Sequence, residues 1–253
     1  MSHALDGEEN APPADAGPAG PVVLLPIVGI PEVSPGADLG TLILEAATAS
    51  GIELADDDVL VVTHKIVSKA EGRIREVPPD DIDARHAIAE MEAARIVRRR
   101  SGLIIAETRH GFVCANAGVD ASNLQPGQVS LLPVDPDKSA RRLRARVRQL
   151  TGHAPALIIT DTFGRAWRIG QTNVAIGVAG MLPVMDYRGS VDQFGVELKV
   201  TTIAVADEIA SAAELVMGKA DRVPAALARG VRYRRGRGSA RALVRQAEDD
   251  LFR

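Results

Sequence analysis

The sequence predicts an α+β fold, or an irregular α/β fold, in which strands and helices are mixed along one large domain. Short runs of branched apolar residues, typical of buried strands, occupy Val59 to Thr63 and Ala156 to Thr160. Segments with helical spacing lie between such runs, but the two types do not alternate regularly, as they would in a doubly wound sheet. The 253 residues, 46% of them hydrophobic, are enough for a core built mainly from Ala, Val, Leu and Ile.

We expect the ordered part of the chain to begin near its first apolar run. Residues 1–20 are rich in Ala, Pro, Gly and acidic side chains and lack periodic apolar positions, so they cannot bury enough surface to offset the entropy of ordering. The sequence therefore predicts a disordered tail over 1–20 and a single domain over 21–253. The first strand is predicted at Val22 to Val28, and the loop that follows is made rigid by Pro31 and Pro35.

Capping residues and periodicity predict the remaining elements. Asp38 and Asp135 stand where helix N-caps are expected, and Pro136 at the first helical position strengthens the second start. Gly51 stands where the first of these helices should stop. The other expected elements are, in chain order, a charged helical stretch at Asp81 to Arg100, strands at Leu103 to Ala106, Val129 to Leu132 and Leu198 to Ala206, and a helix at Asp207 to Met217.

Composition argues against several classes of protein. A net charge of −3 and only 3% aromatic residues disfavour a binder of single-stranded nucleic acid, which needs a basic surface and exposed rings. Cys114 is the only cysteine, so no intramolecular disulfide can form, and we expect a small core residue in a reducing compartment. The sequence has no apolar run of membrane-spanning length and no signal region, so we expect a cytoplasmic protein.

Two polar runs carry the candidate chemistry. They are ETRHGFVCANAGVDASN, from Glu107 to Asn123, and TDTFGRAWRIGQTN, from Thr160 to Asn173. In the second run, Asp161 and Thr162 should emerge at the carboxyl end of a buried strand, where layered α/β proteins usually bind ligands. The sequence contains neither a GxxxxGK[ST] loop nor a GxGxxG loop after a strand, so any nucleotide must bind in another way.

Asp120 and Asp161 predict a site for metal and phosphate. Asp120 is followed by Ser122 and Asn123, and Asp161 by Thr162, so each aspartate comes with short hydrogen-bonding side chains. Such oxygen ligands suit magnesium or manganese. Carboxylates from two strand ends can bridge two cations about 3.5–4 Å apart and so clamp a phosphoryl group in transfer. The simpler alternatives are that Asp120 caps a turn and that Asp161 caps a helix.

Basic side chains follow the same strands. Lys65 and Lys69 lie on one side of a predicted helical turn, where one ammonium can neutralise phosphate charge. The simpler alternative is that both lysines are solvated. His64 can act as a metal ligand or a hydrogen-bond donor, although a lone histidine at a strand end usually does neither. Arg165 and Arg168 can hold carboxylates or phosphates, and they flank a tryptophan on which one of them can stack.

Two further stretches extend this pattern: VVTHKIVSKAEG, from Val61 to Gly72, and AVADEIASAAELVMGK, from Ala204 to Lys219. Together with the two polar runs, and in this order, they resemble the coenzyme F420-0:L-glutamate ligase family. The likeness extends from Val22 to Phe252. The chain is also similar to the amino-terminal ligase domain of the fused bacterial form, in which a nitroreductase-like domain follows near the point where this sequence stops.

The resemblance implies a reaction and its substrates. GTP, L-glutamate and the deazaflavin coenzyme F420-0 would be bound, and GTP would convert the lactyl carboxylate of the coenzyme into an acyl phosphate. The glutamate amine would then displace phosphate, and later glutamates would be joined through γ-linkages. Magnesium or manganese, as two divalent ions, and potassium are the implied ions, and an intertwined homodimer is the implied assembly. Phosphoryl transfer needs charge neutralisation and positioning more than a protein nucleophile, which agrees with the residues present.

Carried onto this sequence, the resemblance assigns roles to particular residues. It places metal ligands at Asp120, Asp161 and Thr162. It places GTP contacts at Ile30, Pro31, Glu32, Val33, His64, Lys69 and Asn123. Asp120, Asp161 and Lys69 are then the catalytic residues, while Arg165 and Arg168 are candidates for binding the incoming glutamate. The sequence departs from the family at His64, where serine is frequent, and at Lys219, where many members have glutamine near the second metal.

Two other classes of function use the same residues differently. A metal-dependent GTP phosphohydrolase could employ both aspartates without requiring glutamate. A non-enzymatic module that binds phosphate-rich ligands or nucleic acid could employ the arginines of Arg141 to Arg148 and Arg232 to Arg241, and its affinity would then depend steeply on salt. The simpler interpretation of both arginine-rich segments is a solvated surface.

Overall fold

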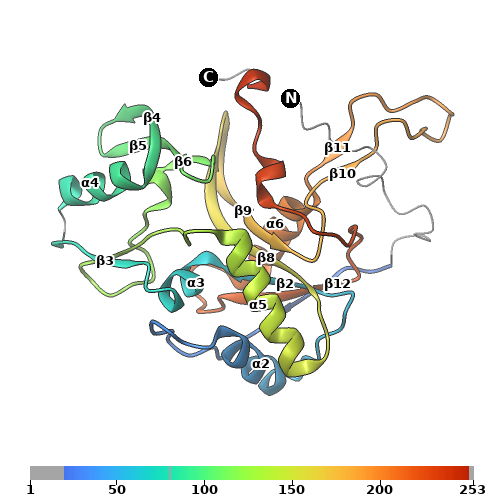
Figure 1. Ribbon diagram of the computed structural model, residues 1–253, viewed down its shortest axis with the longest axis horizontal. Helices are drawn as coiled ribbons and strands as arrows, with labels where there is room; N and C mark the ends of the chain where they lie inside the picture. The colour runs from blue at the N-terminus through green and yellow to red at the C-terminus, as the bar shows by residue number, and fades with distance from the viewer. Residues whose placement is uncertain (1–19, 80, 251–253) are drawn as a thin grey trace.

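The computed structural model describes residues 20–79 and 81–250, so the predicted disordered tail lies almost wholly outside the described residues. A five-stranded sheet stands at the centre of the molecule, with the strand order β1-β12-β2-β8-β9 (Figure 1). Its strands are β1 (Val23–Pro26), β2 (Val59–Thr63), β8 (Ala156–Arg165), β9 (Arg168–Ala179) and β12 (Ala225–Arg229). The expected strands at Val59 to Thr63 and near Val22 are confirmed.

The central sheet is mixed. β2 and β8 are parallel and in register from Val59 opposite Ala156 to Thr63 opposite Thr160, whereas the other neighbouring pairs of this sheet are antiparallel. Helices and strands are interspersed without regular alternation, so the predicted mixed α and β class is confirmed. Because β2 ends at Thr63, the following part of β8 has a strand partner on one side only.

β8 continues beyond the predicted strand end. The sequence suggested that the strand stops at Thr160, but β8 extends to Arg165 and pairs with β9 in a long hairpin. Asp161 therefore lies within a strand, and the alternative that it caps a helix is wrong. This polar, glycine-containing segment lacks the alternation of apolar residues that would have predicted a strand. The backbone hydrogen bonds of the hairpin, rather than burial, hold it extended.

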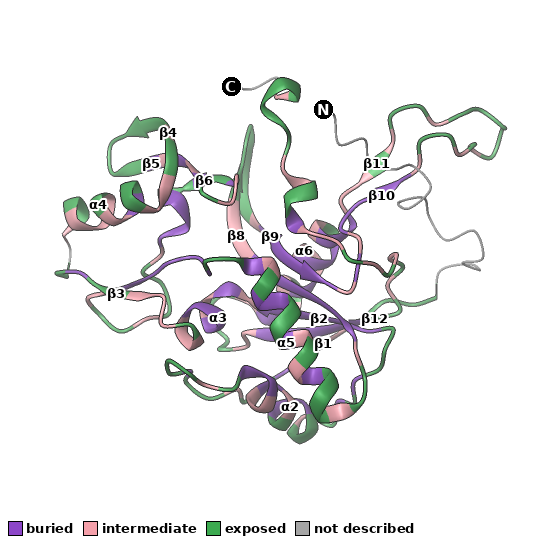
Figure 2. Cartoon of the chain, in the orientation of Figure 1, coloured by how far each residue is buried: buried purple, intermediate pink, exposed green. Residues whose placement is uncertain are grey.

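Helices cover both faces of the sheet. α2 (Leu39–Ala49), α3 (His64–Ala70) and α5 (Pro136–Thr151) contribute to one buried cluster, and α6 (Val205–Met217) contributes to the other. Figure 2 accordingly shows β2 and the first half of β8 as buried. Strands covered on both sides read as continuous apolar runs, which explains why these two were recognisable in the sequence.

The helix starts follow the predicted caps. Asp38 accepts a hydrogen bond from the Thr41 amide, and Asp135 accepts one from the Lys138 amide with Pro136 in the first turn. Gly51 adopts a positive φ of 69° just after α2, as the predicted stop requires. α5 and α6 pack in different buried clusters, on opposite faces of the sheet to which the hairpin of Asp161 and Thr162 belongs.

The charged helix predicted at Asp81 to Arg100 is wrong in its second half. α4 (Ile82–Glu92) ends where β4 (Ala93–Arg100) begins, and β4 pairs with β5 (Leu103–Thr108), which pairs in turn with β6 (Val113–Ala115). Ile96 of β4 packs against a small apolar cluster, so pairing and burial override the helical propensity of the arginines. This sheet and α4 stand to one side of the central sheet (Figure 1).

Two two-stranded sheets lie outside the central sheet. β3 (Ile74–Glu76) pairs with β7 (Gln128–Ser130), which is shorter than the predicted Val129 to Leu132 strand at its carboxyl end. The strand predicted at Leu198 to Ala206 is mostly wrong. β11 (Thr202–Ile203) pairs with β10 (Met185–Asp186), and α6 already begins at Val205 because its apolar face packs on the sheet. The loop between β10 and β11 projects from the body (Figure 1).

The basic carboxyl-terminal segment is anchored at its backbone. Leu182 donates its amide hydrogen to the Arg234 carbonyl, and Gly238 donates to the Met181 carbonyl. Short 3-10 helices follow at Ala240–Leu243 and Ala247–Asp249. Cys114 is buried, as expected for a small core residue. Within the described residues, none of the helices has both the length and the apolar character that crossing a bilayer demands.

Candidate functional site

The candidate site lies where β2 ends and β8 continues. His64, the first residue of α3, is buried and its Nε2 atom lies 3.2 Å from Oδ1 of Asp161. The same oxygen accepts a 2.7 Å hydrogen bond from the Thr162 amide. His64 Nδ1 lies 3.3 Å from Oγ of Ser68, one helical turn later, so the ring is held at both nitrogens. His64 is thus in close polar contact with Asp161, which the usual behaviour of a lone histidine did not predict.

Asp120 lies in the loop before β7 and is held by its own backbone and by a lysine. Its backbone forms a bridge with Ser130, and its Oδ1 accepts the Ser122 amide at 2.8 Å, as a turn-capping aspartate does. Its Oδ2 accepts hydrogen bonds from Lys65 Nζ at 2.7 Å and from the Ser122 hydroxyl. The turn-capping role and a role in a charged site therefore coexist in this residue.

The charge of Lys65 governs the ionisation of Asp120. Burial by itself would raise the pKa of Asp120, but the ammonium of Lys65 and the hydrogen bonds from Ser122 together hold the pKa below its ordinary value. Only 14% of the Lys65 side chain is exposed, so the solvated alternative for this lysine is wrong. Consecutive residues at the start of α3, His64 and Lys65, thus hold the two predicted aspartates.

Thr162 belongs to a second group of polar side chains. Its hydroxyl donates to Oδ1 of Asn173, directly across the hairpin, at 2.7 Å and accepts a hydrogen bond from Lys219 Nζ. Asn173 Nδ2 donates in turn to Glu214 of α6 at 2.7 Å. Asn123 joins this group from the Asp120 loop, because its Nδ2 donates to the Lys219 carbonyl at 3.3 Å.

The predicted nucleotide contacts partly converge. Lys69 Nζ lies 2.5 Å from Oε1 of Glu32, and the Gly36 amide donates to the Ala70 carbonyl, so the loop that includes Ile30 and Pro31 lies against α3. The Lys69 side chain is only 12% exposed while that of Glu32 is 77% exposed, so a solvated Lys69 is also wrong. Val33 is buried and anchors this loop in the core.

Arg165 and Arg168 are not brought to this site. They pair with each other at the tip of the β8–β9 hairpin, where both are exposed. Arg165 Nη2 donates to the Ile169 carbonyl at 2.9 Å, within the same tip. Four residues of extended strand separate Arg165 from Asp161, about 13 Å at 3.3 Å per residue. The prediction that both arginines bind glutamate next to the aspartates gains no support within a single chain.

The oxygen atoms of the site suit a hard cation. Asp161 Oδ2 accepts no hydrogen bond from the described residues, and Asp120 uses three of the roughly four acceptor positions of a carboxylate. Carboxylate and hydroxyl oxygens without sulfur or free imidazole nitrogen match magnesium or manganese. Over residues 20–79 and 81–250, no three His, Cys, Asp or Glu side chains gather closely enough to hold a metal by themselves, so any further ligands must be other oxygens.

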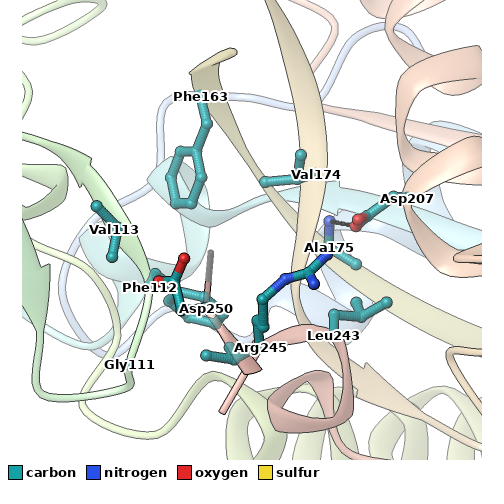
Figure 3. A pocket seen from close by; sticks show the side chains of 11 residues that line it. Gly111, Phe112, Val113, Phe163, Val174, Ala175, Asp207, Leu243, Arg245 and Asp250 are labelled. Atoms are coloured by element: carbon teal, nitrogen blue, oxygen red, sulfur yellow. Dashed lines mark hydrogen bonds between the residues drawn. The ribbon is translucent and has the colours of Figure 1, made fainter. Parts of the chain in front are cut away.

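Beyond Asp161, the same face of β8 borders a cavity of about 300 Å³. Phe163, two residues further along the strand, meets Phe112 edge to face with ring centroids 6.1 Å apart. Figure 3 shows Phe163 and Phe112 among the side chains that line this cavity, together with Arg245 and Leu243 of the carboxyl-terminal segment. The sequence predicted neither the Phe112–Phe163 contact nor the cavity, because both form between segments that are far apart in the chain.

An acidic residue lies at the edge of this cavity. Asp207, in the first turn of α6, accepts a 2.8 Å hydrogen bond from the Ala175 amide (Figure 3). Burial raises the pKa of Asp207, and that single backbone donor offsets the effect only in part. The interaction joins α6 to β9 close to Asn173.

Sequence reasoning missed two members of the polar group around Thr162. Asn173 stands at the end of the second polar run and could have been noticed as the cross-strand partner of Thr162 had the hairpin been predicted. Glu214 is one of several acidic residues in a helix, and its contact with Asn173 had no signal in the sequence.

Comparison with known proteins gives a consistent result. The family model described as F420-0:Gamma-glutamyl ligase matches residues 28–230. A protein of Methanothermobacter thermautotrophicus named Coenzyme F420:L-glutamate ligase is 43% identical over 92% of this chain and 99% of its own length. A protein of the same name from Methanopyrus kandleri is 46% identical over 88% of this chain and 94% of its own length. The matches cover nearly the whole length of both relatives, so neither relative contains a further domain such as that of the fused bacterial form. The comparisons therefore correct the expected similarity to the fused form, because these relatives have a single domain. Since the family model matches most of the sequence, the chain belongs to the F420-0:gamma-glutamyl ligase family.

Proposed function

We propose that the chain is a coenzyme F420:L-glutamate ligase that uses GTP and a divalent cation to join L-glutamate to coenzyme F420-0. Family membership and the names of the relatives supply the reaction. The observation that carries the proposal here is that one short helix, α3, contacts Asp161 through His64 and Asp120 through Lys65, and also carries Lys69. This arrangement gathers carboxylates and an ammonium without any obvious nucleophile.

The chemistry follows from the substrates. The terminal carboxylate of the coenzyme attacks the γ-phosphorus of GTP, the bond to the bridging oxygen breaks, and GDP leaves with that electron pair. The glutamate amine then attacks the acyl carbon, loses a proton, and inorganic phosphate leaves. Each step transfers charge among phosphate oxygens, so the protein contributes mainly by neutralising charge and holding the reactants in line.

Asp120 and Asp161 would hold magnesium or manganese, with the Thr162 hydroxyl as the third oxygen of the predicted set. Such an ion supplies charge stabilisation at the phosphate oxygens during transfer. Oδ2 of Asp161, which accepts no hydrogen bond within the described part of the chain, and the remaining acceptor capacity of Asp120 support this assignment. His64 would orient Asp161 through its other oxygen, much as outer partners orient metal ligands elsewhere.

Lys69, Glu32 and Asn123 would bind GTP, together with the backbone of Ile30, Pro31 and Val33. The support is the ion pair that Lys69 of α3 forms with Glu32 of this loop. In the nucleotide-bound protein the ammonium would exchange part of this contact for a phosphate oxygen. His64 would not contact GTP directly, because its ring is buried against Asp161 and Ser68.

A homodimer completes the proposal. The arm between β10 and β11 is ordered by backbone hydrogen bonds such as Gly189 to Leu198 and Asp192 to Val196, yet it exposes large apolar side chains. Phe194 is 81% exposed and Val200 is 84% exposed. Apolar groups gathered on a projecting arm are typical of a protein interface, and a second copy of the chain is the expected partner.

Mass spectrometry of the coenzyme after incubation with the protein, GTP and Mn²⁺, with and without L-glutamate, tests the reaction. We expect a gain of glutamyl mass only when glutamate is present, in step with GDP release. GDP release that does not depend on glutamate or coenzyme would favour the phosphohydrolase, and unchanged coenzyme and GTP would refute the ligase. Asp161→Asn, which removes one charge from the proposed metal site, should lose the mass gain, and Asp83→Asn, at an exposed position on α4, is its matched control.

A further inference from the structure

Lys219 is placed among oxygen atoms in the way a bound cation would be. Its Nζ donates to the Thr162 hydroxyl, lies 3.2 Å from Oε1 of Glu214 and 3.4 Å from Oδ1 of Asn173. These three oxygens come from both strands of the hairpin and from α6. An ordinary surface ion pair would involve the carboxylate alone, so the group is organised around the ammonium.

The orientation of Asn173 supports this interpretation. Its Nδ2 donates to Oε2 of Glu214, which turns its Oδ1 toward Lys219 and Thr162. The amide, the hydroxyl and the carboxylate therefore all direct oxygen atoms into the same small space. Hydroxyl, amide carbonyl and carboxylate oxygens are the usual ligands of hard cations, and here they surround a lysine nitrogen.

The backbone before Lys219 brings its side chain back onto the hairpin. Gly218 follows the end of α6 with φ 60° and ψ 176°, a conformation available essentially to glycine alone. A Cβ atom at this position would also lie 2.0 Å from Oδ2 of Asp221. The Asn123 side chain then holds the Lys219 carbonyl, so Lys219 is fixed between the Asp120 loop and the hairpin.

We propose that Lys219 is a tethered cation that replaces one of the two divalent ions implied by the family resemblance. The divalent ion would bind at Asp120 and Asp161, and the ammonium would supply the second positive charge beside the transferred phosphate. The proposal rests on the proposed function for the identity of the phosphate. Its cation-binding part stands independently, because it concerns only how many divalent ions these oxygens accept.

Removing the ammonium should open the oxygen group to a second ion. Glutamine in place of lysine keeps a side chain of similar reach, adds a carbonyl oxygen and removes the positive charge that repels a divalent ion. Lys219→Gln should therefore bind two Mn²⁺ per chain in the presence of GDP, where the wild-type protein binds one. Free Mn²⁺, followed by electron paramagnetic resonance during a titration, gives these stoichiometries without any turnover.

Two further variants control the experiment. Lys219→Arg keeps the charge and should still bind one ion, whereas a merely structural effect of altering this position would move both variants alike. Lys138→Gln removes an exposed lysine at the start of α5 and should bind one ion with unchanged thermal stability. Two ions in the wild-type protein, or no second ion in Lys219→Gln, would overturn the proposal.

The same preparations separate this proposal from the proposed function. Glutamate-dependent mass gain with two ions in the wild-type protein would retain the ligase and refute the tethered cation. The predicted change in stoichiometry without any mass gain would retain the tethered cation and refute the ligase. Thermal unfolding of each variant confirms that the comparison is between folded proteins.

Discussion

The two carboxylate oxygens of Asp161 have different surroundings. Oδ1 is engaged by His64 and by the Thr162 amide, while Oδ2 accepts no hydrogen bond from the described residues. A carboxylate with one oxygen fixed and the other available is suited to bind a cation in a defined direction. The charge of Asp161 also acts on the neighbouring thiol of Cys114. Burial is the main cause that raises the pKa of Cys114 to about 12, and the Asp161 carboxylate is the second cause.

Asp161→Asn should lower the rate of glutamate-dependent GDP release by at least about 100-fold, beyond the loss typical of outer partners of a metal. The amide is nearly isosteric and can keep its contacts with His64 and the Thr162 amide, so the melting temperature should change little. Steady-state kinetics and thermal unfolding measure both quantities. A folded variant with wild-type turnover would remove Asp161 from the site.

Lys69→Ala should raise the KM for GTP by about tenfold, in line with the loss of one charge-assisted hydrogen bond, and leave the KM for glutamate nearly unchanged. The physical reason is that the ammonium would contact phosphate, not glutamate. Lys138→Ala, which removes an exposed lysine at the start of α5, is the control and should change neither KM. An unchanged KM for GTP in Lys69→Ala would contradict the proposed phosphate contact.

The hairpin of β8 and β9 is the element that builds the site. It extends past the end of β2, which leaves Asp161 beside α3 and Thr162 beside the end of α6. A third helix, α5, is held against the hairpin by close backbone approach. Gly177 of β9 permits the start of α5 to approach, and the Val178 amide donates to Asp137 of the same helix at 2.8 Å.

Gly177→Ala should destabilise the fold by roughly 1–3 kcal/mol, the usual cost of overpacking. An added Cβ would lie 2.5 Å from the carbonyl carbon and oxygen of Pro136, which belong to the backbone and cannot turn aside. Gly164→Ala in the same hairpin is the control, because nothing lies within 4 Å of its added Cβ. Chemical denaturation measures both, and equal stabilities would contradict the predicted clash.

The contact between α2 and α5 should make stability depend on pH. A hydrogen bond from Arg146 is the main reason that the pKa of Asp38 falls from 3.8 to about 2, aided by Thr41 and opposed by slight desolvation. Because the folded pKa lies below the unfolded value, this contribution is present above about pH 4 and is lost as the pH falls toward 2.

Asp38→Asn should therefore flatten the acid side of the stability curve between pH 4 and 2, measured as the free energy of unfolding at each pH. Asp83→Asn, on exposed α4, should leave the curve of the wild-type protein unchanged. A wild-type slope retained in Asp38→Asn would assign the acid sensitivity to other carboxylates.

At the scale of the whole molecule, the body and the projecting arm have different surfaces. The body buries most of its apolar residues in two clusters on the faces of the central sheet and the rest in two smaller clusters. The arm between β10 and β11 instead presents Val191 at 64% exposure and Phe194 at 81% exposure. An interface with a second copy would remove this apolar area from water and explain why the arm extends from the body (Figure 1).

Phe194→Asp should shift the protein from dimer to monomer, because a charge would be buried without a partner at the proposed interface. Light scattering coupled to size-exclusion chromatography measures the mass. Met91→Asp, which alters a 70% exposed residue on α4, should leave the dimer intact. A wild-type monomer, or a dimer in the Phe194→Asp variant, would contradict this assembly.

Local signals predicted the parts of the fold that depend on short stretches of chain. β2 and the starts of α2 and α5 were recognisable because a doubly covered strand is apolar throughout and a helix start needs a capping oxygen. β4 was misread as helix, because its arginines favour helix and only pairing with β5 makes the segment extended. β12, with its alanine-rich sequence, gave no strand signal at all.

The sequence by itself determined the mixed fold class, the family motifs and the types of residue that the site would contain. The tertiary structure decided which of them meet. It joined His64 to Asp161, Lys65 to Asp120 and Lys219 to Thr162, and it carried Arg165 and Arg168 away to the hairpin tip. Spacing along the chain specifies the direction of a side chain within one element. Contacts between elements depend instead on how far β8 extends past β2 and on where α6 ends. Packing sets both of these positions.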